Sequence, residues 1–228
     1  MRIWGDPNAT YIQINSFPMQ EIHWQGMTNV EAIDFYDSQL DRFPSFTGMT
    51  RLTHLGMSNY RFTTISDLSN LVNLTSLYLD KGNLESIDGL SALVNLQELN
   101  IWHNPLQSLP SIDALVNLAT LSVHSYALAA LPKLNALVKL THLYANQNHL
   151  TALPYLKGLE KLRYIDVQNN RLSAKAIDAI LVQLASTNTP ENGQLNYSGN
   201  PGAANDRRST AASTAKTTLI GRGWTITV

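Results

Sequence analysis

Seven copies of one apolar pattern follow one another along the chain at a constant spacing of 22 residues. Within each copy, apolar residues recur at offsets 0, 3, 6, 8 and 13, and in most copies also at offset 16. A fixed period between about 20 and 29 residues is typical of a solenoid, in which each repeat forms one turn. The copies begin at Met27, Met49, Leu71, Leu93, Leu115, Leu137 and Leu159.

Each repeat contains an alternating segment that predicts a short strand. In Leu77-Tyr78-Leu79, both leucines would point inward and Tyr78 would point to the other face. Neighbouring repeats would pair these strands into a parallel sheet, because a single repeat cannot bury its own apolar face. The return segments carry apolar residues at wider spacing, such as Leu84 and Ile87. We therefore expect short 3₁₀ or extended pieces there instead of full helices.

The segment Leu96-Gln-Glu-Leu99-Asn-Ile101-Trp-His-Asn104-Pro-Leu106 resembles the motif of the leucine-rich repeat family. The phrases Ile65-Ser-Asp-Leu68-Ser-Asn-Leu71-Val-Asn-Leu74 and Leu109-Pro-Ser-Ile112-Asp-Ala-Leu115 are similar to its 22-residue bacterial, internalin-like subclass. The resemblance covers residues 27–172. It implies an α/β solenoid with a curved parallel β-sheet, whose concave face carries the outward strand residues.

The turn after each strand usually holds an inward Asn in such repeats, and its amide can satisfy backbone groups of adjacent turns. Only three of the seven turns keep Asn at this position. Tyr60 and Tyr126 exceed the size of the usual slot, so we expect those turns to open outward or rearrange. The seven positions are Ser38, Tyr60, Gly82, Asn104, Tyr126, Asn148 and Asn170.

The segments that flank the repeats predict caps, which a solenoid needs to cover its apolar ends. Residues 1–26 do not fit the repeat, but Tyr11–Asn15 alternates as a strand and Ile22–Trp24 could form another, which predicts an irregular β cap. Residues 173–228 show a helical pattern over 174–185, a strand-like segment at 195–200, a second helical pattern that Gly221 could stop, and a final strand from Trp224. This order predicts an α/β cap that extends the sheet, so that residues 1–228 form one continuous structural domain.

The C-terminal segment also resembles that of uncharacterised bacterial and bacteriophage repeat proteins. This resemblance covers about 50 residues, from Ile177 to Val228. The resemblance implies that the protein comes from a bacterium or a phage, and a virion surface protein is one of the options.

The composition of the chain limits the classes of function and the cellular locations that it can have. The chain is 44% hydrophobic and has a net charge of −1, which favours one well-buried domain and shows no bias toward nucleic acid. Cysteine is absent, so disulfides, thiolate zinc sites and cysteine nucleophiles are excluded. The segment 1–7 lacks the apolar run of a secretory signal, and no stretch of about 18 apolar residues occurs. We expect no membrane insertion, and a cytoplasmic or virion-associated location rather than Sec secretion.

The predicted concave face is unusually rich in rings. Four of the six histidines and five large aromatic residues fall on outward strand positions. Exposed aromatic side chains with polar neighbours are favoured at recognition surfaces, although a sheet also tolerates Tyr without any function. The candidate binding residues are Tyr36, Tyr78, Trp102, His103, His124, His142, Tyr144 and Tyr164.

Other chemistries receive less support from the sequence. His103 and His124 would lie on adjacent strands with Asp80 one strand away, but no close third ligand and no HExxH motif is present. Ser122 or Ser125 beside His124 lacks the surroundings of a nucleophile elbow. We therefore predict no catalytic residue, no metal and no cofactor.

Charge on the same face argues against nucleic acid as a partner. Its outward positions hold five acidic residues, with Lys81 as the basic one, whereas phosphate binding requires an excess of positive charge. The pair Arg207-Arg208 is interpreted as a solvated edge of the cap. The five acidic residues are Asp34, Asp37, Asp80, Glu98 and Asp166.

Two functional hypotheses follow. The first is a non-enzymatic recognition module that binds a protein or glycan on the concave face and is surface- or virion-associated, as in adhesion. The alternative is a structural or decoration component of a phage or bacterial surface assembly, which docks through its caps or convex face.

Overall fold

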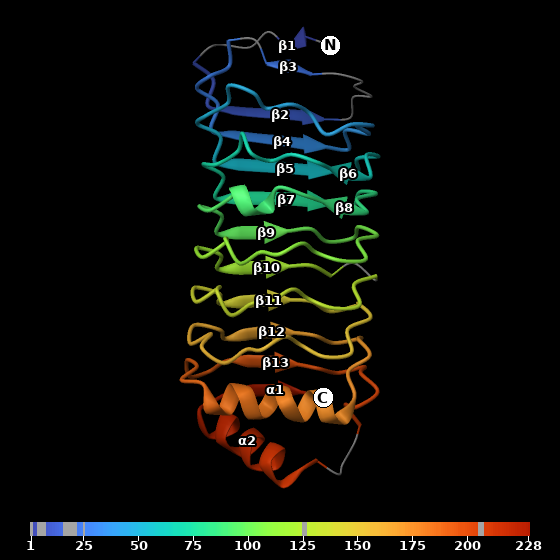
Figure 1. Cartoon of the computed structure of the whole chain (residues 1–228), viewed down its shortest axis with the longest axis vertical. Helices are drawn as coiled ribbons and strands as arrows, with labels where there is room; N and C mark the ends of the chain where they lie inside the picture. The colour runs from blue at the N-terminus through green and yellow to red at the C-terminus, as the bar shows by residue number, and fades with distance from the viewer. Residues whose placement is uncertain (1, 4–7, 16–21, 25, 125–126, 205–207) are drawn as a thin grey trace.

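The computed structural model describes residues 2–3, 8–15, 22–24, 26–124, 127–204 and 208–228. Within them, ten strands pair in parallel as one sheet that runs the length of the molecule (Figure 1). Their order in the sheet is their order in the chain, as a solenoid requires. The strands are β2 (Tyr11–Asn15), β4 (Ala32–Tyr36), β5 (His54–Ser58), β7 (Ser76–Asp80), β9 (Glu98–Asn100), β10 (Thr120–Ser122), β11 (His142–Tyr144), β12 (Tyr164–Asp166), β13 (Gln194–Asn196) and β14 (Thr225–Thr227).

The register of the sheet follows the 22-residue period. His54 aligns with Ser76, Ser76 with Glu98, and the same row continues to Tyr164. Because the register never slips, the side chains that share an offset in the sequence stand in straight rows across the sheet. The predicted parallel sheet and its rows are therefore confirmed.

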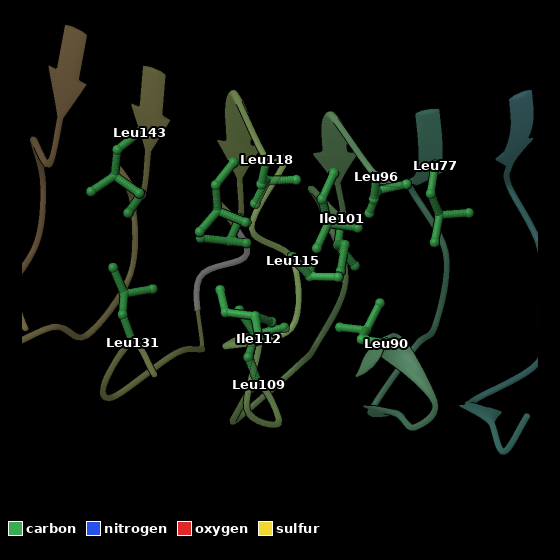
Figure 2. Close-up of a cluster of buried hydrophobic side chains, with 14 of the residues drawn as sticks. Leu77, Leu90, Leu96, Ile101, Leu109, Ile112, Leu115, Leu118, Leu131 and Leu143 are labelled. Atoms are coloured by element: carbon green, nitrogen blue, oxygen red, sulfur yellow. The ribbon is translucent and has the colours of Figure 1, made fainter. Parts of the chain in front are cut away.

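The core lies between the sheet and the return segments of the repeats. The inward strand leucines, such as Leu77, Leu79 and Leu99, are fully buried. Figure 2 shows that leucines and isoleucines of the strands and of the return segments, including Leu77 and Ile112, fill the space between the two sides of the turns in this part of the core. Each repeat thus packs mainly on its neighbours, as expected for a solenoid.

The return segments contain the short elements that wide apolar spacing predicts. Two-residue strands β6 (Thr64–Ile65) and β8 (Ser86–Ile87) pair with each other, and a 3₁₀ turn, η1, covers Leu90–Ala92. Ile65, Ile87 and Leu90 are buried. The expectation of extended or 3₁₀ pieces instead of full helices is confirmed for these repeats.

A ladder of asparagine side chains joins successive turns. Asn104 accepts a hydrogen bond from the backbone NH of Leu84 at 3.0 Å and donates to the carbonyl of Leu79 at 2.7 Å. Asn148 and Asn170 make the equivalent contacts two and three repeats further along. Asn200 continues the ladder from the cap, because its Oδ1 accepts from the backbone NH of Leu172 at 2.9 Å.

Tyr60 occupies the ladder position of its turn in a different way from the one predicted. Its side chain is only 2% exposed, and its hydroxyl donates to Oδ1 of Asn104 at 2.8 Å. The ring crosses the intervening turn because Gly82 has no side chain there: a Cβ at Gly82 would overlap the Tyr60 ring. Of the two outcomes expected for this turn, outward opening is therefore wrong, and the rearrangement consists of the inward ring that reaches Asn104. The same expectation for Tyr126 lies outside the described residues.

The N-terminal region adds strands, as its alternation predicts. β2 pairs in register with β4, so Tyr11–Asn15 forms an additional rung of the main sheet. A second, two-stranded sheet pairs β1 (Arg2–Ile3) with β3 (His23–Trp24) beyond it. Trp24 packs on Phe35 and Phe46, which links this small sheet to the core of the first repeat.

The C-terminal region forms the predicted helix, strand, helix and strand, and Figure 1 shows its two helices at that end of the molecule. Helix α1 (Ala174–Ser186) begins at the N-cap Ser173, and α2 (Thr210–Gly221) begins at Ser209. The apolar face of α1 is buried, and α2 packs beside it. Helix α2 ends at Gly221, as predicted, and Gly223, with φ of 80°, follows the C-cap Arg222.

Arg208 corrects one interpretation of the sequence. Its side chain is 10% exposed and donates to the carboxylate of Asp178 at 3.2 Å and to the carbonyl of Gly202 at 2.9 Å. The guanidinium also lies 5.4 Å from the centre of the Tyr197 ring. Arg208 thus holds the two helices and the preceding turn together, and it is no solvated edge of the cap.

Candidate functional site

The outward strand residues form one surface, which we call the open face of the sheet. It comprises the side chains that alternate with the buried ones and the residues of the turns that follow each strand. Three neighbouring groups of rings lie along it, one on β4, β5 and β7, one after β7, β9 and β10, and one on β11 and β12.

The first group surrounds a glycine. Gly56 of β5 aligns with Asp34 on one side and Tyr78 on the other. Because Gly56 has no side chain, the carboxylate of Asp34 lies over its backbone and accepts hydrogen bonds from Tyr11 at 3.1 Å and from His54 at 3.0 Å. A hollow of about 300 Å³ opens here, and we call it the Gly56 hollow; it is lined by Asp34, Phe35, Tyr36, His54, Gly56, Met57, Ser58, Tyr78 and Asp80.

Tyr78 forms one wall of the Gly56 hollow. Its ring lies 5.4 Å from that of His54, and its hydroxyl donates a hydrogen bond to the carboxylate of Glu98. Burial, and then the bond to the Glu98 carboxylate, raise the pKa of Tyr78 to about 12. The hydroxyl therefore remains a donor at any physiological pH and keeps the ring in place.

The second group is centred on Trp102. Its ring lies 4.5 Å from that of His103 and 4.9 Å from that of His124, measured between ring centres. Lys81 lies in the turn after β7. Its ammonium is 5.5 Å from the centre of the Trp102 ring, within cation–π range. The turn residues Lys81 and His103 both have positive φ, near 50°, as do their counterparts in the other described turns, and this places their side chains beside Trp102.

The electrostatics of this second group are set by burial. Burial, and then the charge of His103, lower the pKa of His124 to about 4, so His124 is neutral at pH 7. Burial raises the pKa of Asp80 to about 6, although Trp102 and Lys81 oppose the shift. Trp102 is near enough to Asp80 to lower its pKa, but neither Oδ1 of Asp80 nor Nε1 of Trp102 has a hydrogen bond of good geometry among the described residues. Both groups are thus partly desolvated without full compensation.

The third group consists of His142, Tyr144 and Tyr164. The rings of Tyr144 and Tyr164 lie 4.8 Å apart, and His142 lies 5.8 Å from Tyr164. Burial lowers the pKa of His142, and the nearby Arg163 adds to the effect. Burial also raises the pKa of Tyr164. Both shifts favour the neutral form of the ring.

The structure places all eight candidate binding residues on the open face, but it does not bring them into one cluster. Tyr36 and Tyr78 line the Gly56 hollow, Trp102, His103 and His124 form the central group, and the other three form the third group. Tyr36 is 47% exposed, whereas the others are half-buried by their neighbours.

Reasoning from the sequence missed several residues of this face. The strand alternation predicts Asp34 and His54 on the outward face but assigns neither to a site, and it gives Gly56 no role. Tyr11 was assigned to the cap, yet it bonds to Asp34. The available signal was Gly56 itself, since it is the sole glycine in a row that otherwise carries Asp, Tyr, Asn and Ser.

Groups that could support catalysis or hold a metal are sparse. Among the described residues, no three His, Cys, Asp or Glu side chains converge. Oγ of Ser122 lies 3.5 Å from Nδ1 of His124, at the limit of a hydrogen bond. Ser125 lies outside the described residues. No helix of the described chain is long and apolar enough to cross a membrane.

Comparison with known protein families identifies the repeats. A model of two consecutive leucine-rich repeats matches residues 138–180, and a model of a single leucine-rich repeat matches residues 95–118. Together with the sheet and the asparagine ladder, these matches show that the chain is built of leucine-rich repeats. No curated protein sequence matches the chain significantly.

Solved structures show the same fold in bacterial proteins. A leucine-rich-repeat protein of Leptospira interrogans is 18% identical, with a TM-score of 0.64 over 96% of this chain. YopM, a leucine-rich effector protein from Yersinia pestis, is 23% identical, with a TM-score of 0.58 over 72% of the chain. An internalin from Listeria monocytogenes is 16% identical, with a TM-score of 0.51 over 91%. The chain spans 60%, 44% and 71% of these three proteins, and at such identities the likeness shows the fold alone.

Proposed function

We propose that this protein is a non-enzymatic recognition module whose open face binds a protein partner. The observation that carries the proposal is the gathering of rings on that face, above all the central group around Trp102. Trp, Tyr and other large side chains supply contact area with few rotatable bonds, so they dominate the binding energy of most interfaces. Solenoids of this kind commonly use their extended sheet face for binding.

The polarity of the open face favours a protein over a glycan as the ligand. Its carboxylates and partly desolvated imidazoles offer sites for the donors and cations of a partner protein. A glycan remains a testable alternative, because aromatic rings beside carboxylates also suit sugars. A glycan array probed with the full chain would separate the two classes.

The experiment that tests this proposal is affinity capture with three baits, namely the wild-type chain, Trp102→Ala and Tyr155→Ala. Tyr155 is a matched control because it is an aromatic residue on a return segment and is 60% exposed. The proposal predicts proteins that the wild type and Tyr155→Ala retain and Trp102→Ala loses. Equal capture by all three baits would argue against recognition through the open face.

A second function is favoured by a separate observation on the edge of the solenoid. Val72, Val94, Val116 and Val138 occupy the same offset in four consecutive repeats and are 46%, 46%, 46% and 52% exposed. An aligned row of exposed valines is suited to lateral docking in a larger assembly, including a virion or a bacterial surface structure. Replacing Val94 and Val116 by Asp would remove such docking and would leave binding by the open face intact.

A further inference from the structure

The Gly56 hollow has the shape of a pocket for one side chain. Its volume of about 300 Å³ is at the lower end of the range of small-ligand sites. Gly56 forms part of its lining, while Tyr36 and Tyr78 contribute aromatic walls. A larger residue at position 56 would displace the carboxylate of Asp34 from this lining, because a Cβ there would overlap it.

The charge of the hollow is negative. Asp34 and Asp80 both line it, and among its described lining residues there is no Lys or Arg. Lys81 follows Asp80 in the sequence, and its ammonium lies over the Trp102 ring. His54 donates its hydrogen bond to Asp34 and not to Asp80. A cation that entered the hollow would therefore find two carboxylates and two aromatic faces.

Asp80 is the less compensated of the two carboxylates. Its Oδ1 is buried and has no hydrogen-bond partner among the described residues. Burial raises the pKa of the carboxyl to about 6, although Trp102 and the charge of Lys81 oppose the shift. Asp34, by contrast, already accepts hydrogen bonds from Tyr11 and His54.

We infer that the Gly56 hollow is an anchor subsite for an arginine side chain of the protein partner. A guanidinium is planar and carries five donors, so it can stack on a tyrosine ring and bond to a carboxylate at the same time. An ammonium offers neither the planar face nor the forked donors. This inference rests on the proposed recognition function and names one chemical group that the open face would select.

The test uses the full chain and a small probe, so it needs no knowledge of the partner. N-acetyl-arginine amide is titrated into the ¹⁵N-labelled protein, and the amide signals of Gly56 and its neighbours are followed by NMR. N-acetyl-citrulline amide, which has the same shape without the charge, and N-acetyl-lysine amide serve as comparison probes. We expect saturable shifts at Gly56 with the arginine probe, and binding at least about fivefold weaker with the other two.

Three variants sharpen the result. Asp80→Asn should weaken the arginine probe at least about fivefold, because it removes the charge and keeps the shape. Gly56→Ala should abolish the shifts by displacing the Asp34 carboxylate, and its melting curve reports whether the fold is retained. Asp166→Asn is the matched control, since Asp166 is also on the open face but lies far along the sheet and bonds to Gln168; it should bind as the wild type does.

The inference is overturned if the arginine probe gives no saturable shift at Gly56, if citrulline or lysine amide binds as tightly, or if Asp80→Asn binds unchanged. Its failure differs from that of the proposed function. If Trp102→Ala loses a captured partner while the arginine probe does not bind, recognition by the open face stands and the arginine subsite falls.

Discussion

Leu99 and Asn100 are neighbours on β9, yet they have opposite surroundings. Leu99 is fully buried in the core, whereas Asn100 points to the open face between Tyr78 and Ser122. Oδ1 of Asn100 has no hydrogen-bond partner among the described residues. The same alternation of burial holds in β4, β7 and β11, whereas the outward residues Gly56, Ser122 and Asp166 are buried as well. Where it holds, it decides which substitutions the fold tolerates.

Leu99→Ala is expected to lower the free energy of unfolding by about 2 to 5 kcal/mol, because it leaves a cavity in a close-packed core. Asn100→Ala should change it by less than about 0.5 kcal/mol, since it removes a side chain whose oxygen is not bonded. Urea denaturation of the two variants provides the comparison. Similar losses would mean that inward and outward positions have been exchanged.

Tyr60 and Gly82 are coupled by shape. Gly82→Ala should destabilise the protein by about 1 to 3 kcal/mol, because the added methyl group displaces the buried ring of Tyr60. In a Tyr60→Asn background the same change should have almost no effect, since the ring is gone. A double-mutant cycle measured by denaturation tests this coupling. Additive effects would show that the ring does not pass over Gly82.

Asp80 and His124 should give opposite pH dependences of stability. The folded pKa of Asp80, about 6, exceeds its usual value of about 3.9, so the native state holds the extra proton and stability falls as pH rises from about 4 to 6. The folded pKa of His124, about 4, is below the usual value of about 6.5, so the unfolded state holds the extra proton and stability rises with pH from about 4 to 6.5.

Asp80→Asn removes the contribution of Asp80 to the pH dependence of stability and leaves that of His124. The variant therefore tests whether the two contributions have opposite signs. The variant should be more stable than the wild type at pH 7, and it should lose stability more steeply on acidification from pH 6.5 to 4.5. Urea denaturation at three pH values within this window measures both effects. Parallel profiles for variant and wild type would contradict the account of Asp80.

At the scale of elements, the C-terminal helices and strands close an apolar end of the solenoid. Leu172 and Val167 are fully buried, and Asn200 supplies the last rung of the ladder to the backbone NH of Leu172. Arg222 donates to the carbonyls of Ala185 and Thr187 at the end of α1, which ties α2 to the first helix. These contacts would all be lost without the segment.

Truncation after Leu172 is therefore expected to give an insoluble protein or one with a much lower melting temperature. Removal of residues 225–228 alone is the control, since it deletes only the edge strand β14 and should have a smaller effect. Expression and thermal unfolding of both truncations give the answer. A chain of residues 1–172 that melts like the full chain would show that the segment is dispensable for stability.

The sequence predicts strands and helices well where the contacts between them follow the 22-residue repeat or the spacing of apolar residues. The rows of the sheet, the strand at Tyr11–Asn15 and the helix after Ser173 all follow from apolar spacing and capping residues. The inward Tyr60 could not be predicted, because its partner Asn104 lies two repeats away and its space depends on Gly82. The Gly56 hollow and the buried Arg208 likewise depend on neighbours that are distant in the chain.

At the scale of the whole molecule, the fold separates stability from recognition. The core, the ladder and the caps hold the solenoid, while the rings of the open face contribute little to that core. Trp102 packs on His103 and His124 at the surface and does not belong to the buried cluster. The central claim is therefore that the ring groups of the open face bind a partner, with Trp102 at their centre.

The measurement that tests this claim most directly is the affinity of Trp102→Ala for the partner recovered by capture, compared by calorimetry with the wild type and with Tyr155→Ala. The account predicts a loss of at least about 2 kcal/mol for Trp102→Ala, or roughly 30-fold in Kd, with an unchanged fold and an unchanged affinity for Tyr155→Ala. An unchanged affinity for Trp102→Ala in a folded protein would contradict it, and would favour docking through the valine row or the caps.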